Sequence, residues 1–205
     1  MFNVIFPILS SFILTGKGPV TVFSSGLYGT MPSNAYSLFL KDLSKDYSVI
    51  TAKSFRPVLK KDVEEYCLKM KINEFIFVSH SSFDHTILES KLCKKAFLVD
   101  PVSLPEFPFE NRRVQTNTST NIIKCKFSYN NKKTNPFILP GFSTSIKGSD
   151  VQLFEFEAGH IDILDNFWAD LGRTFRIYSM YDKNKNLKRS NFRKSVVNII
   201  KKNSQ

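Results

Sequence analysis

Three residues of the chain have the side chains, and the order along the sequence, that acyl transfer requires. Ser81 follows the apolar run FIFVSH, Asp100 ends the run AFLVD, and His160 comes shortly after the run VQLFEFE. A serine hydroxyl can attack a carbonyl carbon if a histidine takes its proton, and a carboxylate on the other ring nitrogen fixes the tautomer of that histidine. We therefore expect Ser81 to be the nucleophile, His160 the general base and Asp100 the orienting acid.

The choice of Asp100 as the acid depends on its position. The acidic residues between Ser81 and His160 are Asp84, Glu89, Asp100, Glu106, Glu110, Asp150, Glu155 and Glu157. The stretch 114–148 contains no Asp or Glu, so the strand expected within it cannot supply the acid. Asp100 alone closes an expected buried strand, where a carboxylate can be held rigidly toward a histidine.

The elements that must position these residues follow an alternating pattern. Short apolar runs rich in β-branched and aromatic residues alternate with segments of helical periodicity, which is typical of an α/β fold with a mostly parallel sheet flanked by helices. The expected strands span residues 19–25, 47–52, 74–79, 96–100, 121–128 and 151–157. Ligands bind at the carboxyl ends of such strands, and all three candidate residues lie at strand ends of this kind.

Helices are expected between the strands. Ser33 can cap a helix whose apolar face carries Tyr36, Phe39, Leu40 and Leu43. A second helix is expected over 62–70 and a short one from Asp84. Segment 2–14 predicts an edge strand and its lead-in, because it lacks both the preceding cations and the cleavage site of a signal peptide.

Three motifs resemble those of a known family. GHIDILD (159–165) resembles the stretch around the catalytic histidine of chlorophyllases and related plant-type α/β-hydrolases, and FLVDPV (97–102) is similar to their strand that ends on the triad acid. VFSSGLYGT (22–30) resembles the strand and loop that supply half of their oxyanion hole. The resemblance covers about residues 20–173, and Ser, Asp, His is the α/β-hydrolase order. It implies a minimal α/β-hydrolase fold without a large cap domain and a chlorophyllase-like or lipase-like serine esterase.

The turn around Ser81 departs from the pattern of that family. The family has Gly-His-Ser-x-Gly-Gly, whereas this chain has Ser79 at the first glycine and Phe83 and Asp84 at the last two. Small residues are needed there because a strand and a helix approach closely around a nucleophile with a strained backbone. The departure supports an alternative function, a binding or scaffolding protein that keeps the fold and has lost the chemistry.

The oxyanion loop is closer to the family pattern. Ser25 replaces its histidine, but Gly26 remains. The backbone N–H groups of Leu27 and Ser82 are therefore the expected donors to a developing oxyanion.

Structural interpretations exist for the same polar residues. Ser81 and Asp100 could simply end strands, and His160 could cap the sheet through a backbone hydrogen bond. The other two histidines, His80 and His85, are interpreted as incidental. The spacing His-x-Asp-x-x-Asp has no established metal-ligand geometry, so Asp162 and Asp165 are expected to brace the following turn.

Composition limits the class of protein. A chain of 205 residues that is 42% hydrophobic and holds 20 Phe can form a single globular domain over 1–205. Three widely spaced cysteines match neither a disulfide framework nor a zinc cluster, which favours reduced thiols and an intracellular, cytoplasmic setting. No stretch has the roughly eighteen uninterrupted apolar residues of a membrane span, and no glycine-rich phosphate loop or other cofactor motif is present.

The net charge of +11 is concentrated near the C-terminus. Residues 183–202 carry eight Lys or Arg and no acid. We expect a basic helix that packs through Phe192, Val196 and Ile199 while its cations face water. The expected partners are a small or lipid-like ester as substrate and, through this basic tail, weak contact with an anionic membrane or nucleic acid.

Overall fold

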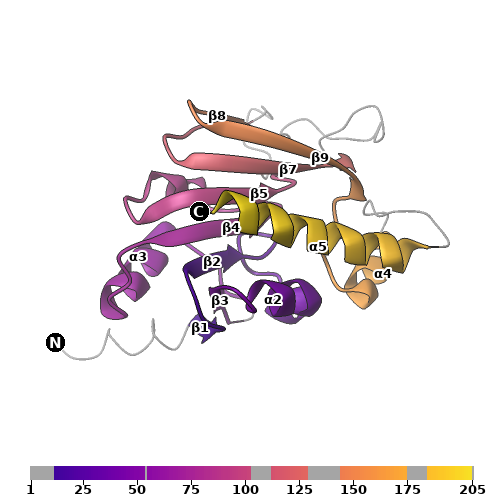
Figure 1. The fold of residues 1–205 in the computed structure, drawn as a ribbon, viewed down its shortest axis with the longest axis horizontal. Coiled ribbons are helices and arrows are strands. Elements are labelled where there is room, and N and C mark those ends of the chain that lie inside the picture. Colours follow the sequence, from indigo (N-terminus) through magenta and orange to yellow (C-terminus); the bar gives the residue numbers. More distant parts are fainter. Residues whose placement is uncertain (1–11, 54, 103–111, 129–143, 175–183, 205) are drawn as a thin grey trace.

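One mostly parallel sheet organises the chain in the computed structural model, which describes residues 12–53, 55–102, 112–128, 144–174 and 184–204. Among the described residues this sheet has seven strands in the order β1-β3-β2-β4-β5-β7-β9 (Figure 1). The strands are β1 (Phe12–Thr15), β2 (Val20–Ser24), β3 (Ser48–Ala52), β4 (Phe75–His80), β5 (Cys93–Val99), β7 (Ser119–Phe127) and β9 (Val151–Gly159). Only β1 runs antiparallel to its neighbour, β3. A separate parallel pair contains β6 (Arg112–Gln115) and β8 (Thr144–Lys147).

All six strands expected from the apolar runs are confirmed. β5 begins at Cys93, three residues earlier than expected, and β9 extends to Gly159. All six residues of β4 are buried. A continuous apolar run is what a central parallel strand needs, because helices cover both of its faces. The edge strand expected in 2–14 is β1, and residues 2–11 of that segment lie outside the described residues.

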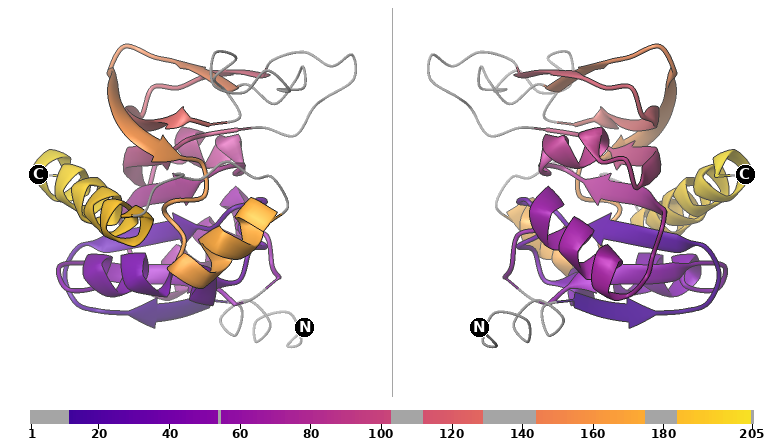
Figure 2. Two further views of the ribbon diagram at one scale, coloured as in Figure 1. Left: turned by 90° about the vertical axis from the view of Figure 1, so that its right-hand side faces the viewer. Right: turned by 90° about the vertical axis from the view of Figure 1, so that its left-hand side faces the viewer.

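Helices cover the two faces of the sheet. One face packs against α2 (Ser37–Leu43) and α5 (Lys185–Asn203), which share an apolar cluster with the strands. The opposite face packs against α3 (Lys60–Lys69) and the 3₁₀ helix η2 (His85–Glu89). Figure 2 shows α5 and α3 on opposite sides of the molecule, with α4 (Asn166–Thr174) at the edge where the strands end. In the part of the chain described, no helix is long and apolar enough to cross a membrane.

The first expected helix is present, but its start differs from the prediction. A 3₁₀ helix, η1 (Ser33–Tyr36), precedes α2, and Pro32 rather than Ser33 is the residue before its first turn. The apolar face is as predicted, since Tyr36, Phe39 and Leu43 are buried. Asp84 caps η2 by accepting a hydrogen bond from the N–H of Thr86.

The basic helix is also present, and one expectation about it is wrong. Phe192 and Val196 pack on the sheet as predicted, but the arginines do not all face water. Arg189 and Arg193 are buried. Buried guanidinium groups require partners, and here these are the carboxylates of Asp162 and Asp170 for Arg189 and the carbonyl oxygen of Leu164 for Arg193.

The strand order changes direction between β2 and β4. The chain runs from β2 outward to β3, returns to place β4 on the other side of β2, and then continues outward through β5 and β7 to β9. Connections at this point leave in opposite directions, and open parallel sheets bind ligands beyond the carboxyl ends of strands at such a point. The segments that follow β2 and β4 begin at Ser25 and Ser81.

Candidate active site

Ser81 sits on a sharp turn immediately after β4. Its φ of +64° is in the left-handed region, which is uncommon for a residue other than glycine. The N–H of Ser81 still donates to the carbonyl of Val99 at 3.0 Å, so the pairing of β4 with β5 continues up to the turn. Strained backbone of this kind concentrates at functional sites.

The turn lacks glycine, and the segment that follows it is the short helix expected from Asp84. The next helix is only the 3₁₀ turn η2, which begins at His85. Phe83 points into the apolar cluster on the α3 face, where its ring lies 5.7 Å from that of Phe77. Phe83 therefore neither crowds the turn nor points outward; it is a core residue.

Asp100 and His160 complete a hydrogen-bonded relay with Ser81. The Oδ2 atom of Asp100 lies 2.6 Å from Nδ1 of His160, and Nε2 of His160 lies 3.0 Å from the hydroxyl oxygen of Ser81. Relative exposures are 0% for Asp100, 5% for His160 and 7% for Ser81. The structure thus brings together the three residues proposed from sequence, although they are far apart along the chain.

Backbone groups hold Asp100 in place. It follows β5 with a φ of +44°, and its own N–H donates to the carbonyl of Ile123 at 2.7 Å. Its second carboxylate oxygen accepts from the N–H of Cys125 at 3.2 Å. A carboxylate fixed by β7 in this way can impose one ring orientation on the histidine.

The loop after β2 lies against the turn after β4. The N–H of Tyr28 donates to the carbonyl of Ser82 at 2.9 Å, and Leu27 and Tyr28 have φ values of +56° and +60°. Among the described residues, neither the N–H of Leu27 nor that of Ser82 donates a hydrogen bond. Two such donors on adjoining turns beside a serine could stabilise a developing oxyanion.

His80 is not incidental, contrary to the sequence-based interpretation. Its ring is buried, with Nδ1 at 2.8 Å from the hydroxyl of Tyr36 and Nε2 at 2.7 Å from the carbonyl oxygen of His160. The same hydroxyl accepts a hydrogen bond from the N–H of Gly26 at 2.9 Å. No periodicity or motif in the sequence signals these contacts, because they join residues 10, 44 and 80 positions apart.

The two aspartates after His160 were expected to brace the following turn, and their side chains instead contact a preceding residue and two helices. Asp162 accepts from the N–H of Gly159 at 2.6 Å and from Nε of Arg189 at 3.0 Å. Asp165 accepts from the N–H of Leu38 at 3.0 Å. In the described part of the chain, no group of three or more His, Cys, Asp or Glu side chains could hold a metal ion.

The three cysteines are poor candidates for a nucleophile. All are free and buried. Burial raises the pKa of Cys67 to about 11 and that of Cys93 to about 12, and it raises the pKa of Cys125 well above its ordinary value. The thiolate is the reactive form of cysteine, so these side chains stay unreactive near neutral pH.

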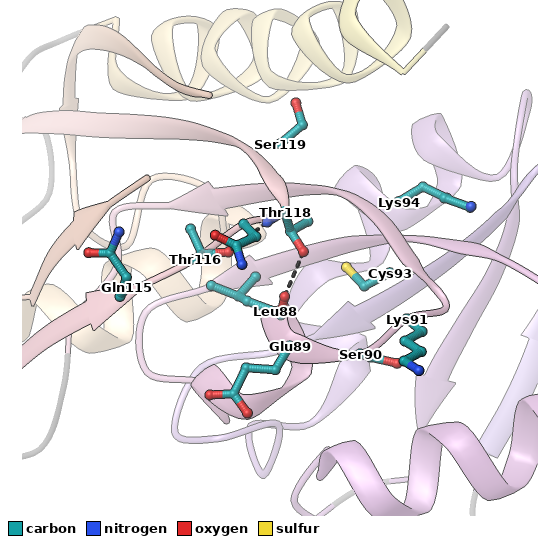
Figure 3. A pocket seen from close by; sticks show the side chains of 11 residues that line it. Leu88, Glu89, Ser90, Lys91, Cys93, Lys94, Gln115, Thr116, Thr118 and Ser119 are labelled. Carbon is teal, nitrogen blue, oxygen red and sulfur yellow. Dashed lines mark hydrogen bonds between the residues drawn. The ribbon is translucent and has the colours of Figure 1, made fainter. Parts of the chain in front are cut away.

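A cavity of about 390 Å³ lies away from the relay, near the start of β5 and β7, and Figure 3 shows the side chains that line it. It is lined where β5 and β7 begin, at Cys93 and Ser119. Its polar groups do not converge on one point: Thr118 donates to the carbonyl of Leu88, and the charged ends of Glu89 and Lys94 extend in different directions in Figure 3. The relay therefore remains the better candidate for chemistry.

Solved structures of hydrolases share the fold of this chain. No protein-family model and no curated protein matches the chain. A hydrolase from Pseudomonas aeruginosa PA01 superposes with a TM-score of 0.54 at 11% identity, covering 81% of this chain and 92% of that chain. MGS-MChE2, an alpha/beta hydrolase enzyme from the metagenome of sediments from the lagoon of Mar Chica, Morocco, gives a TM-score of 0.51 at 13% identity over 80% of this chain and 94% of that chain.

At these identities the likeness concerns the fold alone. The chain has the mostly parallel sheet and flanking helices of an α/β-hydrolase fold, and its described residues form no large cap. The chlorophyllase-like subtype and the roles of the individual site residues stay predictions.

Proposed function

We propose that this chain is a serine hydrolase that cleaves carboxylic esters. The observation that carries the proposal is the relay from Asp100 through His160 to Ser81, with distances of 2.6 and 3.0 Å. Such a relay is the arrangement by which a base activates a serine and a carboxylate orients the base. Its position at the carboxyl ends of β4, β5 and β9, beside the change of direction in the strand order between β2 and β4, agrees with ligand binding in open parallel sheets.

The proposed reaction has two halves. In the first, Nε2 of His160 takes the hydroxyl proton of Ser81 as the oxygen attacks the ester carbonyl, and the imidazolium returns that proton to the departing alcohol. In the second, His160 takes a proton from water, which attacks the acyl-serine, and the proton then returns to Ser81 as the acid departs. Asp100 stays ionised and stabilises the imidazolium in both halves. The N–H groups of Leu27 and Ser82 receive the oxyanion.

Exposed apolar side chains at the carboxyl edge of the sheet favour an ester with an apolar part. Large apolar side chains are exposed on the segments that leave the carboxyl ends of the strands: Phe55 after β3 is 78% exposed and Phe167 at the start of α4 is 70% exposed. Leu27, in the loop after β2, is also exposed. A lipase-like or chlorophyllase-like substrate would use such groups, and the pigment itself is suggested by the sequence resemblance alone.

Hydrolysis of p-nitrophenyl acetate and butyrate tests the proposal. Activity should fall to background in Ser81→Ala and in His160→Ala, and it should survive in Ser119→Ala, a control at the opposite end of the sheet. A fluorophosphonate probe should label the wild type at Ser81 and leave the Ser81→Ala variant unlabelled. Undiminished hydrolysis by Ser81→Ala would refute the assignment of the nucleophile.

The same probe separates catalysis from a binding or scaffolding role. The unusual turn at Ser79 and Phe83 favours that alternative, because the family pattern has glycine at both positions. A folded wild type that is never labelled and hydrolyses no ester would support the binding role.

A further inference from the structure

A buried series of hydrogen bonds connects the oxyanion loop, the residue before the nucleophile and the catalytic histidine of the candidate site. It runs from the N–H of Gly26 to the hydroxyl of Tyr36, from there to Nδ1 of His80, and from Nε2 of His80 to the carbonyl oxygen of His160. The three distances are 2.9, 2.8 and 2.7 Å. Tyr36 has a relative exposure of 0% and His80 of 3%.

The direction of every hydrogen bond in this series follows from the chemistry of its ends. A carbonyl oxygen can only accept, so Nε2 of His80 carries the proton that is shared with His160. Tyr36 accepts from Gly26 and uses its single hydroxyl proton toward Nδ1 of His80. That nitrogen is then unprotonated and His80 is neutral. Burial favours the same state, since it lowers the pKa of His80 well below 6.5 and raises the pKa of Tyr36.

We propose that His80 and Tyr36 are positioning residues for the catalytic histidine and the oxyanion loop. This inference depends on the proposed function, because it assigns their task in that reaction. His80 fixes the main chain of His160, while Asp100 fixes its ring. Tyr36 fixes Gly26, the residue directly before the proposed donor Leu27.

The geometry gives each contact a consequence for catalysis. His80 directly precedes Ser81 in the backbone, and its ring donates a hydrogen bond to the carbonyl oxygen of His160. The same residue therefore connects the nucleophile to the base. The rings of His80 and His160 lie 4.7 Å apart, so a charge on His80 would oppose the imidazolium that forms on His160 during the reaction. A neutral His80 orients the base without this penalty. The Tyr36 hydroxyl extends the connection to the loop that must receive the oxyanion.

A purely structural role makes a different prediction. If the two side chains only filled the core, substitutions would lower stability and leave the activity of the folded fraction unchanged. If they position the base and the loop, kcat falls while KM changes little, because the ground-state contacts with the ester remain. Small displacements of reacting groups can cost up to about a hundredfold in rate.

Kinetics on p-nitrophenyl butyrate with folded variants provide the first test. His80→Leu and Tyr36→Phe should each lower kcat about tenfold or more, with KM within about twofold. His80→Gln should keep kcat within about threefold of wild type, because its amide can donate to His160 and accept from Tyr36. The double variant His80→Leu with Tyr36→Phe should have a kcat no lower than that of the less active single variant, since both substitutions break the same series of hydrogen bonds. His85 takes no part in these hydrogen bonds, so His85→Gln is the matched control and should have the kcat and KM of the wild type.

Nitrogen NMR of the histidine rings provides a test that needs no activity. The wild type should show one buried neutral histidine protonated at Nε2, and its Nδ1 signal should move in Tyr36→Phe and stay in place in His85→Gln. This arm also decides the matter if His80→Leu does not fold, because Tyr36→Phe removes only one oxygen. A His80 ring protonated at Nδ1 instead of Nε2, or a Tyr36→Phe variant with unchanged kcat, would overturn the inference.

The outcomes separate this inference from the proposed function. A wild type that neither hydrolyses the ester nor reacts with fluorophosphonate would refute the function, and with it the positioning role. An active wild type with equally active His80→Leu and Tyr36→Phe variants would refute the positioning role alone.

Discussion

Replacing Arg189 by alanine should destabilise the fold more than any other single change in α5. The guanidinium is completely buried, and it donates through Nε to Asp162 and through Nη1 to Asp170, both at 3.0 Å. Alanine would leave the buried carboxylate of Asp162 without its cation. Removing one partner of a buried ion pair costs about 3–5 kcal/mol, which is a large part of the 5–15 kcal/mol by which a typical domain is stable.

The same helix supplies a matched control. Lys201 pairs with Asp46 at 2.5 Å, but the two side chains are 42% and 43% exposed. Exposed pairs contribute about 0–1 kcal/mol, so Lys201→Ala should change the free energy of unfolding by no more than that. Urea denaturation followed by circular dichroism measures both variants. Equal and small losses for Arg189→Ala and Lys201→Ala would refute the reasoning.

A double substitution tests whether the unpaired carboxylate causes the loss of stability in Arg189→Ala. Asp162 also accepts the N–H of Gly159, the residue directly before His160, so Arg189 supports the loop that carries the base. Combining Arg189→Met with Asp162→Asn removes both charges, keeps an acceptor for Gly159, and should recover most of the stability lost in Arg189→Ala. If the double variant is as unstable as Arg189→Ala, an unpaired carboxylate is not the cause of the loss.

Four further predictions concern other parts of the molecule. Because burial lowers the pKa of His80 below its ordinary 6.5, the unfolded chain takes up a proton that the folded chain does not. The free energy of unfolding should therefore decrease as pH falls below about 6.5, with His80 contributing up to about 1.4 kcal/mol per pH unit, and His80→Gln should lack that contribution in urea titrations across pH 5–7. Ser81→Gly should be more stable than Ser81→Ala by about 1 kcal/mol in thermal unfolding, since only glycine is relaxed at a φ of +64°; the reverse order would contradict the strained turn. Phe55→Ser should raise KM for p-nitrophenyl decanoate more than for the acetate, whereas the equally exposed Leu68→Ser on α3 should not, and equal effects would argue against apolar contacts with the substrate near Phe55. We propose that the tail 183–202 gives only weak, salt-sensitive retention on heparin or anionic vesicles, because two of its arginines are buried; nanomolar binding to nucleic acid at physiological salt would contradict this.

The sheet was predictable because its strands have strong local signals. β4 and the apolar part of β5 (96–99) are runs too short for a helix; β4 ends at His80, and Asp100 directly follows β5. The three triad candidates could be placed by the same signals, since a residue that directly follows a parallel strand lies at the ligand-binding edge. Because 114–148 contains no Asp or Glu and Asp100 closes an expected buried strand, the acid could be assigned without knowledge of the structure.

Long-range polar contacts were not predictable in this way. Arg189 belongs to a run of cations that usually forms a solvated surface, and only the position of Asp162, 27 residues earlier, places it in the core. The sequence does not indicate the role of His80, because its partners, Tyr36 and the backbone of His160, become its neighbours only once the sheet and η1 are assembled. Periodicity reports which face of an element is buried, and it carries no information on which buried polar groups meet.

Phe83 gives the sharpest contrast between family pattern and structure, because glycine at this position should harm the protein. By analogy with the family, Phe83→Gly would restore a tight turn after Ser81. In the structure the ring is 6% exposed and packs against Phe77, so its removal should cost about 3–5 kcal/mol, as for other buried aromatic residues. Ser79→Ala is the control at the other unusual position: its hydroxyl is buried, and among the described residues it has no hydrogen-bond partner, so the change should lie within about 1 kcal/mol of neutral.

Urea denaturation and the rate of fluorophosphonate labelling together measure the outcome for Phe83. A stable Phe83→Gly variant that labels faster than the wild type would show that the turn is crowded by this side chain. Lower stability with no gain in labelling is expected instead. The short 3₁₀ helix after the turn leaves room for a residue that a longer, closely packed helix would exclude, and the protein uses that room to bury an aromatic ring beneath its candidate nucleophile.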